Sequence, residues 1–384
     1  MPTRRYLQAA IAAASLAVLA GAAPLGAQAA DPGYRVGVVS ESGDIVTWLR
    51  PGAGTLVVDH VVPIGIMRSD IDGPHNVTVA PDQKSYYVSV AHGTPYGSLW
   101  RLSLPGDTLI GRAPLELFPT TISVTPDGEI AFVANSDFYG DRPRINPISI
   151  IHTPTMSKIA DVPACDMPHG VKVNHGGTHV YITCMHSDEI LELDPGTFSV
   201  SRRGRTGSGH EMAGMAGMAH GAAAPSAPAP ATPAAEPVCA PTFVSVSPDD
   251  RRFYVACNTG NTVQVWDAVS MTRIHEIPVG HGAYNVEASA DGKLVIVTNK
   301  KDKSVSILDA NSYAELARVP TSKGVVHGVA YSPDGRYAYI SSESVGADPG
   351  AVDMIDLTTR KVVASVPVPL QPTGITIWRQ GGSK

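Results

Sequence analysis

The chain has 384 residues, of which 43% are hydrophobic and 17% are charged, with 37 glycines and 32 prolines. This turn-rich composition is typical of β-proteins and excludes both an intrinsically disordered chain and a coiled coil. The net charge of −6 offers no electrostatic basis for nucleic-acid binding, which depends on a cationic surface.

The first segment of the chain, residues 1–30, has the pattern of a secretory signal peptide. A basic end with Arg4 and Arg5 precedes an Ala- and Leu-rich run over residues 9–23, and small residues lead to a cleavage point near Ala30. The arginine pair is also compatible with twin-arginine export. No later segment is long and apolar enough to span a membrane. We therefore expect a mature chain in the periplasm or outside the cell, consisting of one domain over residues 31–384.

The mature chain starts with three strand-like segments that have no inner strand before them: Tyr34–Ser40, Asp44–Leu49 and Thr55–Val61. The last strand-like run, Gly374–Trp378, is an inner strand without its own turn. We expect these four segments to pair in one sheet. Such a sheet joins the two ends of the chain and removes the open sheet edges.

Between these ends, six segments repeat one pattern: an apolar run, a Pro-Asp-Gly-like turn and a second apolar strand. We call the position two residues before each apolar run the slot. The slots are His75, Thr120, His169, Thr242, Tyr284, His327 and Thr373, at steps of 42 to 49 residues apart from one step of 73. A period of about 40–50 residues with four short strands per unit is typical of propellers. With the closing sheet, the sequence predicts an all-β, seven-bladed β-propeller with four antiparallel strands per blade.

Histidines concentrate at one predicted end of the central channel. In an antiparallel blade, the slot and the end of the second strand lie at the same end of the sheet, so these positions surround one channel mouth. Histidine occupies these positions at His75, His92, His169, His186 and His327, and Asp137 ends a second strand between them. Neutral imidazole is the commonest transition-metal ligand among side chains. We therefore expect a metal or haem site, with Asp137 as a ligand or as an acceptor for a ligand. Structural histidines that bond to the backbone, and acid/base catalysis, are the alternatives.

The four cysteines follow the same repeat. Cys184 and Cys257 occupy equivalent positions in adjacent repeats, and Cys165 and Cys239 lie shortly before the slots of those repeats. In an oxidising compartment, this arrangement predicts the disulfides Cys165–Cys184 and Cys239–Cys257. Thiolate ligands beside His169 and His186, and free thiols, are the alternatives.

An insertion over residues 204–238 accounts for the long step between two slots. Its second half is an Ala/Pro spacer. Its first half holds methionines and histidines among small residues, namely His210, Met212, Met215, Met218 and His220. Thioether sulfur favours Cu(I), so we expect copper binding here, with a plain flexible linker as the alternative.

The strand-end sequences Tyr254-Val255-Ala256-Cys257-Asn258 and Val297-Thr298-Asn299, with the repeated Ser-Pro-Asp-Gly turns, resemble the YVTN family of exported seven-bladed propellers. The resemblance covers about residues 34–378 and implies the fold, because propellers carry many unrelated functions.

Two further propellers have a distant similarity to the predicted mouth. In nitrous oxide reductase, propeller histidines hold a copper cluster, and in a periplasmic nitrite reductase the haem d1 domain carries its cofactor in the mouth. The Pro-His starts at His75 and His169 resemble such ligand positions. The chain lacks the adjacent His-His pair of the first protein and the eight blades of the second, and it has no Cys-x-x-Cys-His sequence for c-type haem. The resemblance thus implies where the site lies and leaves copper and haem d1 both open.

Three functions follow from these features. The first is a binding or redox-associated propeller with copper or haem at its mouth. The second is a cofactor-free scaffold that binds a periplasmic protein, a glycan or a small ligand. The third is a lactonase-type hydrolase that uses His75, Asp137 or His327 as acid or base, although no serine nucleophile elbow or Glu-His metalloprotease motif accompanies it. We expect the first, with enzymatic activity undecided.

Overall fold

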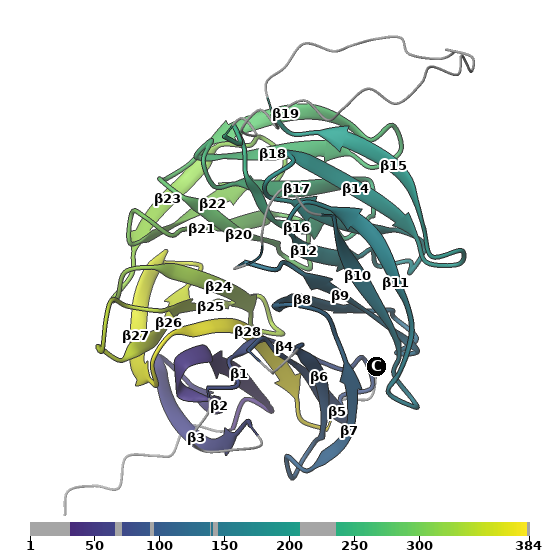
Figure 1. The fold of residues 1–384 in the computed structure, drawn as a ribbon. Coiled ribbons are helices and arrows are strands. Elements are labelled where there is room, and N and C mark those ends of the chain that lie inside the picture. Colours follow the sequence, from purple (N-terminus) through teal and green to yellow (C-terminus); the bar gives the residue numbers. More distant parts are fainter. Residues whose placement is uncertain are drawn as a thin grey trace, which may run out of the picture. The chain divides into compact units, whose positions relative to one another are not determined.

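The computed structural model describes residues 31–65, 71–92, 96–138, 140, 145–207 and 236–381. These residues form seven four-stranded antiparallel sheets, so the predicted all-β, seven-bladed propeller is confirmed (Figure 1). The only helical element in these ranges is the 3-10 turn η1 (Glu41–Gly43). Nor do these ranges contain a helix long and apolar enough to cross a membrane.

We number the blades along the chain from the first complete one and name their strands from the channel outward. Blade 1 is β4 (Pro74–Val79), β5 (Ser85–Val90), β6 (Ser98–Ser103) and β7 (Leu109–Pro114); blade 2 is β8 (Pro119–Val124), β9 (Ile130–Asn135), β10 (Asn146–His152) and β11 (Ser157–Cys165). Blade 3 is β12 (Pro168–Val173), β13 (Val180–Cys184), β14 (Glu189–Asp194) and β15 (Ser199–Arg205); blade 4 is β16 (Pro241–Val246), β17 (Arg252–Cys257), β18 (Thr262–Asp267) and β19 (Thr272–Pro278). Blade 5 is β20 (Ala283–Ala288), β21 (Leu294–Asn299), β22 (Ser304–Asp309) and β23 (Glu315–Pro320); blade 6 is β24 (Val326–Tyr331), β25 (Tyr337–Ser342), β26 (Gly350–Asp356) and β27 (Lys361–Val368). Blade 7 is β28 (Pro372–Arg379), β1 (Tyr34–Ser40), β2 (Ile45–Gly52) and β3 (Thr55–Pro63).

The hydrophobic core is divided among the junctions between neighbouring blades. Each of seven clusters of buried side chains fills one junction. At the junction of blades 7 and 1, for example, the ring of Trp48 lies 5.3 Å from Tyr86 and 5.8 Å from Trp378. Burial of such large aromatic rings is a main source of folding free energy, so each blade depends on both neighbours.

Blade 7 closes the ring with both ends of the chain, as the sequence predicted. Strand β1 pairs antiparallel with β28, with Tyr34 opposite Arg379 and Val38 opposite Ile375. The turn after β1 is thereby brought beside blade 1. This turn contains Glu41, which lies at the channel mouth and contacts His75 of blade 1.

The repeated Pro-Asp-Gly turns are structural. In blade 4, Asp249 accepts hydrogen bonds from the Ser247 hydroxyl at 2.6 Å and from the Arg251 backbone N–H at 3.1 Å. In blades 5 and 6 the turn glycines, Gly292 and Gly335, have φ of 68°, a conformation that glycine adopts without strain. These turns connect the inner and second strands at the end opposite the slots, so they take no part in the mouth.

A backbone clamp fixes the mouth end of every blade. The residue two before the slot has positive φ, and its carbonyl accepts the N–H of the residue that directly follows the second strand. We call the latter the rim residues. The pairs are Gly73 with Ala91, Phe118 with Ser136, Met167 with Met185, Ala240 with Asn258, Gly282 with Lys300, Val325 with Glu343, and Gln371 with Glu41.

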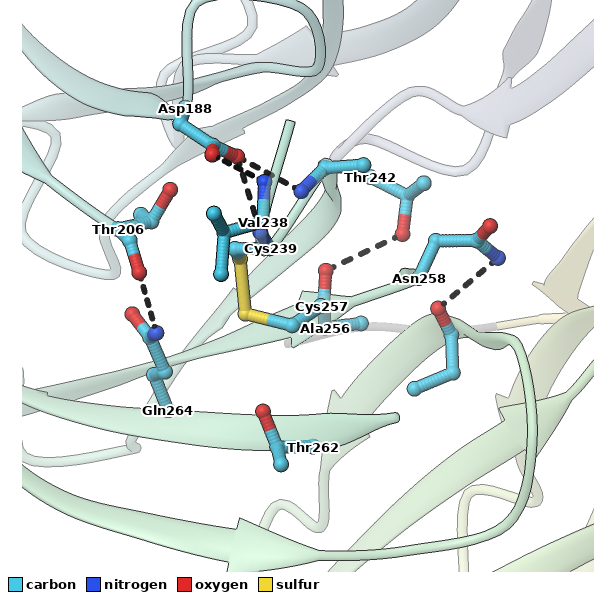
Figure 2. The surroundings of a disulfide bond; sticks show 12 residues. Asp188, Thr206, Val238, Cys239, Thr242, Ala256, Cys257, Asn258, Thr262 and Gln264 are labelled. Carbon is cyan, nitrogen blue, oxygen red and sulfur yellow. Dashed lines mark hydrogen bonds between the residues drawn. A yellow bond between two sulfur atoms is a disulfide. The ribbon is translucent and has the colours of Figure 1, made fainter. Parts of the chain in front are cut away.

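Both predicted disulfides are present, and free cysteines are absent from the described residues. The first joins Cys165, the last residue of the outer strand of blade 2, to Cys184 at the end of the second strand of blade 3. The second joins Cys239, in the segment before the inner strand of blade 4, to Cys257 at the end of the second strand of the same blade. The thiolate-ligand alternative is therefore excluded. Figure 2 shows the blade 4 bond beside Asp188, whose carboxylate accepts N–H groups from Val238, Cys239 and Ala240.

Candidate functional site

The slot carbonyls form a closed belt of hydrogen bonds between neighbouring blades. Each slot carbonyl accepts a hydroxyl from the preceding blade. The donor and acceptor pairs are Thr373 to His75, Ser89 to Thr120, Thr120 to His169, Thr183 to Thr242, Thr242 to Tyr284, Thr298 to His327, and Ser341 to Thr373. A hydrogen bond of this kind contributes about 0.5–1.5 kcal/mol to stability, so the belt fastens the blades around the channel.

The donors divide the blades into two classes. In three blades the slot residue itself is the donor, namely Thr120, Thr242 or Thr373. In the other four blades the donor is a second-strand hydroxyl, Ser89, Thr183, Thr298 or Ser341, and the slot holds His75, His169, Tyr284 or His327. These four slot side chains are therefore not the hydroxyl donors of the belt. We call them the mouth quartet.

The rings of the mouth quartet gather in the channel although they come from blades 1, 3, 5 and 6. The ring centroids lie 6.3 Å apart for His75 and His169, 5.5 Å for His169 and Tyr284, 4.6 Å for Tyr284 and His327, and 5.7 Å for His327 and His75. Phe243 packs against three of these rings, at 5.0 Å from His169, 5.5 Å from Tyr284 and 6.1 Å from His327. The sequence prediction that slot histidines converge is confirmed for these three histidines.

His75 is held by a carboxylate from the closing blade. Its Nδ1 lies 2.6 Å from Oε2 of Glu41, and Oε1 of the same carboxylate lies 3.1 Å from Nε2 of His92. Burial raises the pKa of Glu41, but the charges and hydrogen bonds of both histidines outweigh burial and hold this pKa at about 2. A carboxylate only accepts hydrogen bonds, so Nδ1 of His75 carries a proton. Its buried Nε2 has no hydrogen-bond partner among the described residues.

His169 has the opposite character because both of its ring nitrogens are engaged. Nδ1 donates to the Thr242 carbonyl at 3.0 Å, and Nε2 lies 3.0 Å from the hydroxyl of Tyr284, which must then be the donor. The ring is 0% exposed, and burial, with the neighbouring charge of His75, lowers its pKa to about 3. His169 is thus a neutral residue that holds Tyr284, in line with the structural alternative considered from the sequence.

His327 is buried without hydrogen bonds. It is 1% exposed, its Nε2 lies 3.9 Å from Oε1 of Glu343, and neither ring nitrogen has a hydrogen-bond partner within the part of the chain that the structure describes. Burial, reinforced by the charge of Lys300, lowers the pKa of His327 well below its ordinary value. Lys300 itself pairs with Glu343 at 2.7 Å and lies 4.2 Å above the Tyr284 ring. An unpaired buried polar group costs about 1–3 kcal/mol, so His75 and His327 are placed for something other than stability.

A cavity of about 820 Å³ opens above these rings at the mouth. From the mouth quartet it is lined by His75, Tyr284 and His327, and from the rim residues by Glu41, Met185, Asn258, Lys300 and Glu343. Phe118 and Phe138 form an aromatic wall, with ring centroids 4.7 Å apart and Phe118 5.4 Å from His75. The cavity is of the size that small-molecule and cofactor sites have, about 300–1,000 Å³.

The second-strand residues expected at the mouth differ in register from those that line the cavity. His92, Asp137 and His186 are not among the lining residues; Phe138 and Met185, one position away along the chain, are. All of these residues follow the ends of the second strands, and the position in blade 5 that is equivalent to His92, Asp137 and His186 is Lys301, which does line the cavity. His92 reaches Glu41 instead, and Nδ1 of His186 lies 3.9 Å from Asp166.

The copper expectation gains no support from these positions. In the described ranges, no group of three or more His, Cys, Asp or Glu side chains is placed to hold a metal ion. The insertion ligands, His210, Met212, Met215, Met218 and His220, lie outside the described residues.

Several site residues were not identified from the sequence. Glu41, Tyr284, Lys300 and Glu343 were not assigned to the site. A signal for Tyr284 exists in the sequence, because the position fourteen residues after each slot is Ser or Thr where the slot is His or Tyr, but Ala134 and Ala256 where the slot is Thr.

Residues 295–381 match the family described as the cytochrome D1 heme domain. The matched segment includes Lys300, His327 and Glu343, whereas His75 and His169 lie before it. A curated relative, dihydro-heme d1 dehydrogenase of Pseudomonas aeruginosa, is 33% identical over 88 residues, which is 23% of this chain and 17% of that protein. The match therefore spans less than a fifth of the relative's own length.

Two solved structures share the fold over most of the chain. Hydrazine synthase of Kuenenia stuttgartiensis superposes with a TM-score of 0.62 at 19% identity, covering 83% of this chain and 94% of that chain. A functionally unknown protein from Desulfotomaculum acetoxidans gives 0.68 at 12% identity, covering 89% and 98%. The similarity to haem d1 propellers expected from the sequence is thus confirmed over the C-terminal blades, whereas membership of the YVTN family stays a prediction.

Proposed function

We propose that this protein is an exported, haem-associated redox propeller that binds a haem d1-type tetrapyrrole at the channel mouth, with His75 as the iron ligand. The observation that carries the proposal is the state of His75. Its Nδ1 donates to Glu41 at 2.6 Å, while its Nε2 is buried, lies without a partner among the described residues, and belongs to a ring that lines the cavity.

The residues present fit such a group. A histidine whose second nitrogen donates to a carboxylate is the usual arrangement of a metal-ligating histidine, because the carboxylate fixes the tautomer and raises the basicity of the ligating nitrogen. The aromatic wall of Phe118 and Phe138 supplies apolar contact for a flat macrocycle, and lysines at the cavity supply cations for its carboxylates. A bound iron tetrapyrrole supplies one-electron redox chemistry.

The other residues of the cavity have separate tasks. His327 stays neutral and offers one donor and one acceptor nitrogen to the occupant of the cavity. Tyr284 is held in place by His169, and Phe243 packs against both rings, so the three aromatic side chains form a packed floor for the cavity. The Glu41 carboxylate retains the Nδ1 proton of His75.

The comparisons support the haem assignment over copper. The matched family is described as a haem d1 domain, and the curated relative is named for its action on dihydro-haem d1. Export through the segment 1–30 is part of the same proposal, and N-terminal sequencing of the mature protein tests it.

The test moves the hydroxyl that donates in the belt from the second strand to the slot, so that the slot histidine is replaced while the belt keeps its hydrogen bond. We call this change blade conversion. His75→Thr/Ser89→Ala removes the proposed ligand in this way. His327→Thr/Ser341→Ala makes the same conversion in blade 6 and is the matched control. We expect purified wild-type protein and the blade 6 variant to bind added haem with a ligand-shifted absorption band, and the blade 1 variant to lose that band while still unfolding cooperatively.

Three results would overturn the proposal. Wild-type protein that binds no haem leaves a cofactor-free scaffold, and an identical haem spectrum in the blade 1 variant removes His75 as the ligand. Stoichiometric copper in protein purified from copper-replete cells, lost in the blade 1 variant, replaces haem with copper.

A further inference from the structure

We infer that Lys301 and Lys303 form an anion subsite that binds the carboxylates of the cavity's ligand. This makes the ligand a carboxylate-bearing macrocycle that enters with its carboxylates toward blades 5 and 6. That the ligand is a tetrapyrrole rests on the proposed function. That the cavity binds carboxylates at Lys301 and Lys303 rests on the geometry of the turn that carries them.

Both lysines lie in the turn between β21 and β22 and line the cavity. They are exposed, and neither has an ion-pair partner in the described part of the chain. The turn is fixed at its start, where the Lys300 and Lys301 N–H groups donate to the carbonyls of Gly282 and His281 at 2.8 and 3.1 Å. Two free ammonium groups are therefore mounted on a rigid support at the cavity wall.

The acidic groups near these lysines are already engaged elsewhere. Asp302 lies between them in the sequence, but its carboxylate accepts the His281 backbone N–H at 2.6 Å and lies 3.0 Å from Nδ1 of that residue. Glu343 pairs with Lys300 at 2.7 Å. The positive charges of Lys301 and Lys303 thus remain uncompensated, in a chain whose net charge is −6.

Among the mouth loops that the structure describes, the cations are concentrated in one stretch of the chain. In the described loops that follow the second strands or precede the inner strands, every Lys or Arg lies between Lys300 and Lys323. The Glu41 carboxylate of blade 7 accepts hydrogen bonds from His75 and His92. Lys301 and Lys303 therefore attract the anionic edge of such a ligand toward blades 5 and 6.

Lysine is suited to this task. Its ammonium acts as a mobile point charge with three donors on a flexible stem, and charge-assisted hydrogen bonds to carboxylates are among the stronger polar contacts in proteins. Two free ammonium groups at the wall of this cavity therefore discriminate a carboxylate-bearing macrocycle from an uncharged or cationic one of the same size.

The experiment separates this subsite from iron ligation by using porphyrins without metal. Fluorescence titration measures binding of coproporphyrin III, which carries carboxylates, and of tetrakis(N-methylpyridyl)porphyrin, which is cationic. The variants are Lys301→Glu/Lys303→Glu and the milder Lys301→Gln/Lys303→Gln. The matched control is Lys84→Glu, which reverses the charge of an exposed lysine that has no ion pair among the described residues. Lys84 lies in the turn between β4 and β5, at the end of blade 1 opposite the mouth.

We expect the charge-reversed variant to bind coproporphyrin at least about tenfold more weakly than wild type, since it replaces two charge-assisted hydrogen bonds by repulsion between like charges. The glutamine variant should lie between the two, Lys84→Glu should match wild type, and the cationic porphyrin should not favour wild type over the lysine variants. Added salt should reduce the difference.

Equal coproporphyrin affinity in wild type and both lysine variants overturns the inference, as does absence of coproporphyrin binding by wild type. Failure of the proposed function looks different. If coproporphyrin binding depends on the lysines but haem ligation does not depend on His75, the haem function is wrong and the anion subsite stands. If haem ligation depends on His75 but coproporphyrin binding does not depend on either lysine, only the anion subsite is wrong.

Discussion

The carboxylate of Glu41 contacts the imidazole of His75 at 2.6 Å, although Glu41 belongs to blade 7 and His75 to blade 1. The contact crosses the junction where the two ends of the chain meet. Because β1 reaches this place only by pairing with β28, closure of the propeller and assembly of the site are one event.

Replacing the carboxylate tests its influence on His75. Glu41→Gln keeps the shape of the side chain but removes the charge that fixes the Nδ1 proton, and such outer partners typically change metal affinity roughly ten- to hundredfold. We expect haem affinity to fall by this factor, measured by absorbance titration. The control is Glu116→Gln, since the Glu116 carboxylate pairs with Lys158 at 2.8 Å and does not line the cavity. This variant should bind haem as tightly as wild type. A similar loss of affinity in both variants would contradict the account.

The fastening belt predicts a rescue. Thr242→Ala leaves the Tyr284 carbonyl without its donor and should lower the free energy of unfolding by about 1–3 kcal/mol. Adding Ala256→Ser moves the hydroxyl to the position that carries it in blades 1, 3, 5 and 6, so most of this loss should be recovered in urea unfolding. Equal stability of the single and double variants would show that the two positions are not equivalent.

Stability should fall as the pH drops below neutrality because of His169. Its pKa is lowered from 6.5 to about 3 in the folded protein, so between these values the unfolded chain binds a proton that the folded chain does not. The free energy of unfolding therefore decreases toward low pH, by about 1.4 kcal/mol per pH unit for one such histidine. His169→Thr/Thr183→Ala should flatten the pH dependence by about this slope, measured by urea unfolding from pH 7 to pH 5. An unchanged slope would mean that His169 is protonated in the folded protein.

The disulfides should stabilise blades 3 and 4 to a similar degree. The bridged cysteines are 19 and 18 residues apart, and closing a loop of this length contributes about 3 kcal/mol in the chain-entropy model. Cys165→Ala/Cys184→Ala and Cys239→Ala/Cys257→Ala should each lose about that amount in chemical unfolding without reducing agent. A loss in only one of them would show that the other bond adds nothing to stability.

The fold was accessible to sequence reasoning because its signals are local and repeated. The turn aspartates, the spacing of the slots and the strand-like ends each predict one feature, and together they predict seven blades closed by both ends of the chain. The cysteine pairing was equally accessible, because Cys184 and Cys257 occupy equivalent positions in adjacent repeats.

The site was accessible only in part, because side-chain direction and partners depend on contacts between blades. Convergence of His75, His169 and His327 follows from the blade geometry, but the one-residue shift that places Met185 rather than His186 at the cavity does not. Nor does the sequence reveal that His169 is engaged by Thr242 and Tyr284 while Nε2 of His75 is left free. The sequence shows that a slot threonine, such as Thr242, goes with an alanine fourteen residues later, whereas Tyr284 goes with Thr298. Only the hydrogen-bond belt in the structure explains this correlation.

The most direct test of the central claim is the resonance Raman spectrum of ferrous, haem-reconstituted protein in the region of the iron–histidine stretch. The account predicts this band in wild type and in His327→Thr/Ser341→Ala, and its loss in His75→Thr/Ser89→Ala. A band that survives in the His75 variant, or that is absent from wild-type protein with stoichiometric haem, would contradict the assignment of His75 as the iron ligand.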